Sequence, residues 1–456
     1  MIYTTTKRIT GIILLMIMMQ TAKAQRGDIQ YFRPYDQRGI NVFETSKIDT
    51  VVYEGLRVRL GGNFTQGYQS LQHSNTSGVA LYDLSPGFPL AQANMNIDVQ
   101  LADGVRLNLV SYMSAHHHNE TWVKGGYFQI DKVSFLKSDL LDKIWKDLTL
   151  KVGHMEINYG DAHFRRSDGG NTFWNPFMEN NIMDAYTTEI GAELYWHKEG
   201  IIAMFGMTNG EIQGSVTKSA SRAPSVYGKL GYDKAFGERS RVRLTGSFLS
   251  KKSSVSGTLY GGDRTGSNYQ FVMEPVTATL TSNAFSGRMN PNFRDNVMAI
   301  MINPFIKICG FELFGTYEMA QGNNAVENGE IQYMATAGDA GIFSKLDDRK
   351  FMQYEVDMLY RFGAREQFYA GAKYNTVKGS QVFGQTTTTT TAGGISQGIR
   401  ADVSIDRTAF AGGWFITRNI LVKGEYIMQN YNDFPTGDIM QGGKFDGFVL
   451  QGSIAF

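Results

Sequence analysis

The sequence predicts an all-β chain that folds as a transmembrane antiparallel β-barrel of about 16 strands, with short periplasmic turns and long extracellular loops. Three observations predict this fold: an N-terminal export signal, long segments of alternating polar and apolar residues, and connections that alternate between short and long. The composition agrees, because the 456 residues include 51 Gly, 29 Phe and 23 Tyr, and aromatic residues favour strands. A single Cys excludes an intramolecular disulfide framework.

The first residues predict a signal peptide over 1–24. Two basic residues precede an apolar run of 11 residues, Ile9 to Met19, and the small residues Ala22 and Ala24 occupy the two positions that signal peptidase reads. This run is shorter than the roughly 20 residues that a spanning helix needs. We therefore expect export, followed by a pre-barrel segment over 25–55 that caps the periplasmic mouth, enters the lumen or packs between subunits.

Sixteen segments alternate in the manner of β-strands, and together they predict a barrel over 56–456. Strands of soluble proteins usually have 5 or 6 residues, whereas a tilted strand needs about 9 to 11 residues to cross a bilayer. The charged faces are too numerous for a packed core, so we expect them to line a water-filled lumen while the apolar faces meet outer-membrane lipid. The predicted strands are 56–70, 90–102, 104–115, 123–135, 147–157, 186–197, 200–208, 224–235, 239–251, 296–308, 310–320, 351–363, 366–377, 399–416, 418–430 and 444–456.

Short connections, such as Ala102 to Gly104 and His197 to Glu199, alternate with long polar stretches. This regular alternation indicates periplasmic turns and external loops of an outer-membrane barrel, with both termini inside. The chain also ends in its last predicted strand on Phe456, which resembles the C-terminal signal that the barrel-assembly machinery reads. The long stretches are 71–89, 158–185, 209–223, 252–295, 321–350, 378–398 and 431–443.

Four strings between residues 150 and 210 carry a resemblance to a known family: Val152 to Ile157, Phe177 to Asn180, Ile190 to Leu194, and Met207 to Gly210. They are similar to the region of the fifth to seventh strands in the phosphate-selective porin O and P family. The resemblance implies a sixteen-stranded, usually trimeric outer-membrane porin, in which the loop between strands five and six folds inward and narrows the pore. Phosphate selectivity does not carry over, because the sequence has no basic cluster dense enough for a dedicated anion ladder.

The inward loop that the resemblance implies is loop 158–185. In a narrow lumen, the interaction between a charged side chain and a passing ion is poorly screened, so such a loop sets both pore size and charge preference. We expect Arg165 and Arg166 to face acidic groups across an eyelet. The alternative is an external loop whose aromatic residues pack on the rim or on a neighbouring subunit. The predicted constriction residues are Asp161, His163, Arg165, Arg166, Asp168 and Glu179.

The facing of the predicted strands also assigns charged residues to the lumen wall. Basic residues gather on some strands and acidic residues on others, which would create a transverse field that favours polar or zwitterionic solutes and mild ion selectivity. Cross-strand ion pairs that keep the wall straight are the alternative, and both can hold together. The predicted wall residues are Arg57, Arg59, Asp98, Arg106, Glu189, Glu193, Lys229, Asp233, Arg241, Arg243, Glu312, Glu318, Glu355, Asp357, Arg361, Lys373, Lys423 and Glu425.

The sequence thus predicts a porin, in the outer membrane of a Gram-negative cell, that passes small hydrophilic solutes or ions by diffusion. We expect a homotrimer in outer-membrane lipid, with no cofactor and no metal. We also expect no catalytic residue, because no strand places a Ser nucleophile beside a His base. A formal net charge of +1 gives no footprint for nucleic acid. One alternative is a closed-lumen barrel that acts in adhesion or partner binding through its long external loops. Another is a specific channel for a hydrophobic or sugar substrate.

Overall fold

The structure is a computed structural model that describes residues 28–49, 51–114, 121–167, 170–210, 223–237, 239–252, 257–261, 270–283, 287–329, 345–385 and 396–456. The signal peptide predicted over 1–24 lies outside these residues. No helix in the described part of the chain is long and apolar enough to cross a membrane.

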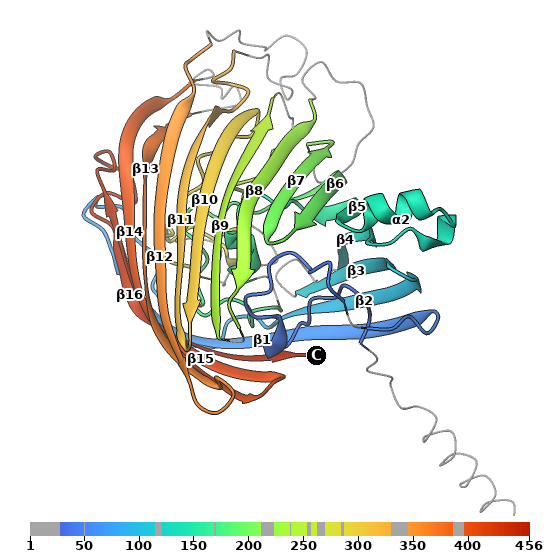
Figure 1. Ribbon diagram of the computed structural model, residues 1–456. Helices are drawn as coiled ribbons and strands as arrows, with labels where there is room; N and C mark the ends of the chain where they lie inside the picture. Colours follow the sequence, from blue (N-terminus) through green and yellow to red (C-terminus); the bar gives the residue numbers. More distant parts are fainter. Residues whose placement is uncertain are drawn as a thin grey trace, which may run out of the picture.

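The described chain forms a closed barrel of sixteen antiparallel strands, in which each strand pairs with the next and β1 pairs with β16 (Figure 1). The predicted antiparallel β-barrel of sixteen strands is therefore confirmed. The strands are β1 (Arg57–Ser74), β2 (Gln92–Ala102), β3 (Val105–Ser114), β4 (Thr121–Ile130), β5 (Leu148–Glu156), β6 (Thr188–Lys198), β7 (Ile201–Thr208), β8 (Ser225–Ala235), β9 (Ser240–Lys251), β10 (Asn296–Ile308), β11 (Phe311–Asn323), β12 (Arg349–Phe362), β13 (Phe368–Phe383), β14 (Ile399–Thr417), β15 (Ile420–Asn432) and β16 (Lys444–Ala455).

Few helices accompany the strands. They are the 3-10 helices η1 (Gln37–Gly39), η3 (Ser134–Leu136) and η4 (Ala162–Arg165), and the α-helices α2 (Asp139–Trp145) and α3 (Leu280–Asn283). Helix α2 lies in the connection between β4 and β5 and projects away from the barrel (Figure 1). The side chain of Ser138 caps this helix, because it accepts a hydrogen bond from the amide of Leu141.

The strand β12 shows how the sequence orients the wall. Its residues alternate between buried and exposed without interruption, because successive side chains of a strand point to opposite faces. Gln353 and Asp357 are buried inside the barrel, whereas Tyr354 and Val356 are exposed on the outside. The polar face therefore lines the lumen, and the apolar face forms the outer surface.

One end of the barrel carries tight turns, and we call it the short-turn end. Two residues each connect β2 to β3, β6 to β7, β10 to β11, and β14 to β15. In the turn between β6 and β7, Glu199 and Gly200 both have positive φ angles, 52° and 90°. A two-residue hairpin turn whose twist matches the flanking strands needs such angles, and Gly adopts them without steric cost.

Two segments that are not part of the wall fill much of the lumen. The first is loop 158–185, in which Phe177, Ile182 and Met183 are fully buried. The second is the N-terminal segment 28–49, which lies at the mouth of the barrel close to the C-terminus of the chain (Figure 1). Both segments pack against the inner face of the wall, so the core of the protein sits inside the barrel.

Candidate functional site

Wall side chains from β15 hold loop 158–185 in the lumen. The ammonium group of Lys423 donates hydrogen bonds to the carbonyl oxygens of Thr172, Asn175 and Phe177, at 2.9, 2.9 and 2.7 Å. The carbonyl groups of a loop inside a barrel have no partner in a strand ladder, and a buried carbonyl without a partner is costly. Lys423 supplies three such partners, which explains why a lysine is buried at this point of the wall.

Strands β12 to β14 hold the next part of the same loop. The amide of Ile182 donates to Asn375 at 2.6 Å, and the amide of Met183 donates to Gln353 at 2.9 Å. The guanidinium group of Arg407 donates to the carbonyl oxygen of Asn180 at 2.6 Å. Loop 158–185 is therefore attached at several points to the inner face of the wall.

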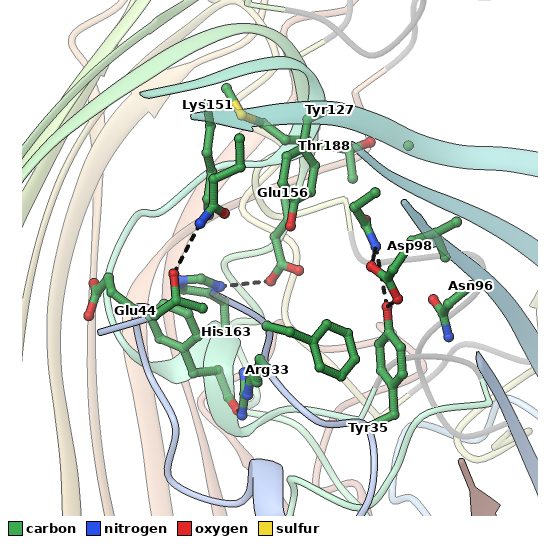
Figure 2. Close-up of a pocket in the computed structure, with 18 of the residues that line it drawn as sticks. Arg33, Tyr35, Glu44, Asn96, Asp98, Tyr127, Lys151, Glu156, His163 and Thr188 are labelled. Carbon is green, nitrogen blue, oxygen red and sulfur yellow. Dashed lines mark hydrogen bonds and ion pairs between the residues drawn. The ribbon is translucent and has the colours of Figure 1, made fainter. Parts of the chain in front are cut away.

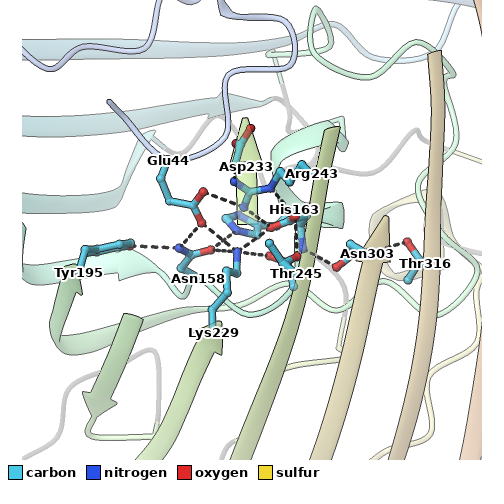
Figure 3. A network of polar contacts seen from close by, with 12 residues as sticks. Glu44, Asn158, His163, Tyr195, Lys229, Asp233, Arg243, Thr245, Asn303 and Thr316 are labelled. Carbon is cyan, nitrogen blue, oxygen red and sulfur yellow. Dashed lines mark hydrogen bonds and ion pairs between the residues drawn. The ribbon is translucent and has the colours of Figure 1, made fainter. Parts of the chain in front are cut away.

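Asp161, at the start of the loop, is fully buried. Its partners Lys229, Arg243 and Thr245 are labelled in the network of polar contacts that Figure 3 shows. The carboxylate of Asp161 accepts hydrogen bonds from Arg243 at 2.7 and 2.8 Å, from Lys229 at 2.8 Å and from Thr245 at 2.7 Å. Burial alone would raise the pKa of Asp161, but Arg243 and Lys229 outweigh it and lower the pKa to about 2. The carboxylate is thus charged at neutral pH.

Glu44 of the N-terminal segment completes this network from the opposite direction. Its carboxylate lies 3.1 Å from Lys229 and 2.7 Å from Arg243, and it accepts a hydrogen bond from Asn158 at 3.0 Å. Burial opposes the charge of Glu44, but Arg243 and Lys229 hold its pKa well below the usual range. Two carboxylates from separate segments therefore share two wall cations.

The two arginines of the predicted eyelet are buried in the packing of the loop. Arg166 donates to Asp184 of its own loop at 2.6 and 3.1 Å, so its acidic partner does not lie on the opposite wall. Arg165 lies 3.8 Å from Glu312 and 3.8 Å from Asp357. The acidic groups that face Arg165 are therefore on the wall at contact distance, with no open eyelet between them.

The other predicted constriction residues have separate positions. His163 lies between Glu156 and Asn158, with nitrogen to oxygen distances of 2.8 and 2.9 Å. Glu179 accepts a hydrogen bond from Gln270 and lies 4.0 Å from Arg407. Asp168 lies outside the described residues.

Most of the predicted wall residues take part in cross-strand ion pairs. Arg361 lies 2.8 Å from Glu312, and Glu189 lies 3.0 Å from Lys251. Lys373 lies 3.6 Å from Asp357 and 4.0 Å from Glu355, and Arg241 pairs with Asp233. Arg59 and Arg106 lie 3.8 and 3.9 Å from Asp98. Glu193 accepts hydrogen bonds from Tyr227 and Tyr195, Glu318 accepts from Tyr159 and Tyr260, and Arg57 pairs with Glu54 near the rim.

A cavity of about 210 Å³ remains between loop 158–185, the N-terminal segment and the inner face of β1 to β6 (Figure 2). Asp98 and Glu156 line it, together with the basic side chains of Arg33 and Lys151 and the ring of Tyr35. Tyr35 donates a hydrogen bond to Asp98 at 3.1 Å. Charged, amide and aromatic groups thus surround a space in which water and small polar solutes fit.

Several of these cavity residues are absent from the sequence prediction. Lys151 alternates with the outward-facing Leu150 and Val152, so the pattern of its strand contains the signal that places it in the lumen. Arg33, Tyr35 and Glu44 precede the first strand, where no alternation exists, and no local signal assigns them to the lumen.

The wall defines the class of protein. The sheet closes on itself and leaves no edge, and its outer face carries apolar side chains such as Leu244, Val356 and Leu450. A closed sheet satisfies every ladder hydrogen bond internally, which hydrocarbon surroundings require. The protein is a sixteen-stranded transmembrane β-barrel, an integral protein of the outer membrane of a Gram-negative bacterium.

No family model matches the sequence, and no curated protein matches it. Among solved structures, the chain is similar to an anion-selective porin from Comamonas acidovorans, with 11% identity, 88% of this chain and 100% of that chain covered, and a TM-score of 0.49. It is also similar to the outer membrane channel DcaP of Acinetobacter baumannii, with 10% identity, 89% and 99% covered, and a TM-score of 0.47. It is similar as well to OmpF of Salmonella typhi in complex with daunomycin, with 14% identity, 89% of this chain and 99% of that chain covered, and a TM-score of 0.46. At these identities and TM-scores, the assignment of the fold rests on the strand pairing of the chain itself.

Proposed function

We propose that the protein is a porin that lets small hydrophilic solutes and ions diffuse through a lumen narrowed by loop 158–185. The observation that carries the proposal is the polar cavity along β1 to β6. It lies inside a closed barrel, and residues of loop 158–185 such as His163 and Trp174 form part of its lining. In this proposal the short-turn end faces the periplasm and the long connections face the exterior, as in other outer-membrane barrels.

The charges around the cavity favour anions over cations. Asp98 lies near two arginines, Glu44 shares Lys229 and Arg243 with Asp161, and the carboxylate of Glu156 lies 2.8 Å from His163. By contrast, neither Arg33 nor Lys151 forms an ion pair with a carboxylate of the described residues; Arg33 instead donates to two carbonyl oxygens, and Lys151 to the hydroxyl of Tyr195. Cationic charge without a neutralising partner lowers the energy of an anion in the pore.

Single-channel recording of the refolded mature protein, with a salt gradient across a planar bilayer, tests this function. We expect stable current steps and a reversal potential whose sign indicates a mild preference for anions. A correctly folded and inserted barrel that conducts no current would contradict the proposal.

A closed-lumen barrel that binds partners through its external loops is the second candidate. The observation that favours it is the N-terminal segment 28–49, which occupies part of the lumen at the short-turn end. The same recording separates the two candidates, because a scaffold with a closed lumen gives no current steps.

The oligomeric state, the assembly route and the closer family belong to the same proposal. We expect a homotrimer, which steps that occur in threes and the mass of the detergent-solubilised particle would support. Phe456 exchanges two hydrogen bonds with Gly62 of β1, and we expect the barrel-assembly machinery to read this C-terminal residue, so its deletion should reduce insertion. The lumenal position of loop 158–185 supports the resemblance to the phosphate-selective porin O and P family. Phosphate specificity is not part of the proposal.

A further inference from the structure

We propose that the N-terminal segment 28–49 forms the second wall of the pore constriction, and that Glu44 in this segment is a residue that determines ion preference. The inference rests on the proposed porin function and goes beyond it. It assigns a role in selectivity to a segment that lies outside the barrel wall and outside the inward loop.

The N-terminal segment extends across the lumen from one side of the wall to another. Near its start, Gln30 accepts a hydrogen bond from the amide of Gly104, in the turn between β2 and β3, at 2.8 Å. Further along, the amide of Gln37 donates to the carbonyl oxygen of Arg418, in the turn between β14 and β15, at 3.0 Å. Only β1 and β16 separate these strands, but Asn41 further along donates a hydrogen bond to Glu312 of β11 at 2.8 Å, far from β2 around the barrel. The segment therefore crosses the lumen, and a solute at the short-turn end meets it.

An aromatic contact holds the segment beside the loop. Phe43 is buried between Phe305 of β10 and Phe164 of loop 158–185, with ring centroids 5.4 and 5.7 Å apart. The guanidinium carbon of Arg243 lies 4.3 Å from the centre of the Phe43 ring. The residue before Glu44 is therefore fixed against both the wall and the loop.

A polar contact fixes the segment a second time. The side-chain amide of Asn41 donates to Glu312 at 2.8 Å and accepts a hydrogen bond from Arg165. The carbonyl oxygen of Asn41 also accepts a hydrogen bond from Arg241 at 2.7 Å. Asn41 and Phe43 thus fix the chain just before Glu44 to the wall and to the loop, so the segment is a built part of the constriction.

The charge balance of this network depends on the segment. Without Glu44, the network has one positive charge more than it has negative charges. Glu44 neutralises this excess, and its side chain lines the cavity. The network contains the cations Lys229, Arg241 and Arg243 and the carboxylates Glu44, Asp161 and Asp233.

The substitution Glu44→Gln tests the proposal in the full mature chain, because it removes one negative charge and keeps the shape of the side chain. We expect the permeability ratio of anions to cations to rise about fourfold, because Coulomb's law for one unit charge at about 10 Å in a water-like dielectric gives about twofold for each ion, in opposite directions for anions and cations. The conservative variant Glu44→Asp retains the charge and should retain the wild-type ratio. The matched control is Glu54→Gln, which makes the same charge change at an exposed residue before the barrel.

The outcomes separate this inference from the proposed function. A wild-type barrel that is folded but silent contradicts the porin function. A conducting wild type, together with a folded Glu44→Gln variant whose permeability ratio equals that of Glu54→Gln, overturns the role of Glu44. Heat-modifiable migration on a gel shows whether Glu44→Gln folds. If it does not fold, the variant Thr45→Glu tests the proposal instead, because Thr45 lines the same cavity. We expect this added carboxylate to shift the ratio towards cations, and an unchanged ratio would contradict the proposal.

Discussion

Asp161 and Arg243 form an ion pair with two hydrogen bonds inside the barrel, from Nε to Oδ2 at 2.7 Å and from Nη2 to Oδ1 at 2.8 Å. Asp161 belongs to loop 158–185 and Arg243 to β9, so the pair joins the lumenal loop to the wall. Both side chains are almost completely buried. A buried pair of this kind contributes through the cost of leaving either partner alone, more than through its own net attraction.

Removal of the Asp161 carboxylate from this ion pair should therefore destabilise the barrel. The variant Asp161→Asn leaves Arg243 and Lys229 with Glu44 as their shared acidic partner, and we expect a loss of about 3 kcal/mol, the low end for a broken buried pair. Equilibrium unfolding in urea with lipid vesicles measures this loss. Asp139→Asn, at the exposed start of α2, is the control and should change little. Equal stability of the two variants would contradict the assigned role of Asp161.

Lys423 should control the position of loop 158–185. Lys423→Met removes three hydrogen bonds from a charged donor, each of which contributes about 1.5–3 kcal/mol. We expect the loop to move more freely, with a larger and noisier single-channel conductance and a lower thermal stability. Lys143→Met, on the exposed face of α2, serves as the matched control. A conductance identical to that of the control would show that Lys423 does not hold the loop.

Lys151 should contribute directly to the preference for anions. It lines the cavity without a carboxylate partner among the described residues, so Lys151→Gln removes cationic charge that nothing neutralises. We expect the permeability ratio of anions to cations to fall about fourfold, about twofold for each ion at about 10 Å in a water-like dielectric. Reversal potentials in a salt gradient measure the ratio, and Lys146→Gln, exposed beside α2, should leave it unchanged. No shift in the Lys151 variant would exclude this side chain from the path of the ions.

The stability that Asp161 confers should depend on pH in a definite direction. Its pKa falls from 3.8 to about 2 on folding, so its contribution is fully present above about pH 5 and is lost as the pH falls towards 2. We therefore expect the difference in thermal midpoint between wild type and Asp161→Asn to stay constant from pH 8 to 5. The difference should shrink below pH 4. A difference that already disappears near pH 6 would show that another group governs the effect.

The strand pattern was readable because it is local. Alternation of polar and apolar residues has a period of two, so each window of the chain contains the position and facing of its own strand. The predicted strand 296–308 coincides with β10. The predicted strand 123–135 runs five residues beyond the end of β4 at Ile130. Val133 and Phe135 continue the alternation there, although Ser134–Leu136 forms a 3-10 helix.

The lumen was readable only in part. The inward facing of Lys229 and Arg243 followed from their strands, but their partner Glu44 lies in a segment with no periodic pattern, far away in the chain. Arg166 was assigned to an open eyelet, and the structure pairs it with Asp184 of its own loop. Composition and spacing show that a loop is charged, but they do not show which charged side chains form ion pairs.

The amino-acid sequence thus determines the sixteen strands, their two faces and the closed barrel. The alternation of polar and apolar residues acts within each strand, and the surrounding lipid selects the orientation in which the apolar face points outward. The course of loop 158–185, the entry of residues 28–49 into the lumen and the pairing of buried charges follow from the folded chain. Closure of the barrel brings β8, β9, the loop and the N-terminal segment within contact distance. Ion pairs depend on that three-dimensional distance, which no local pattern of residues specifies.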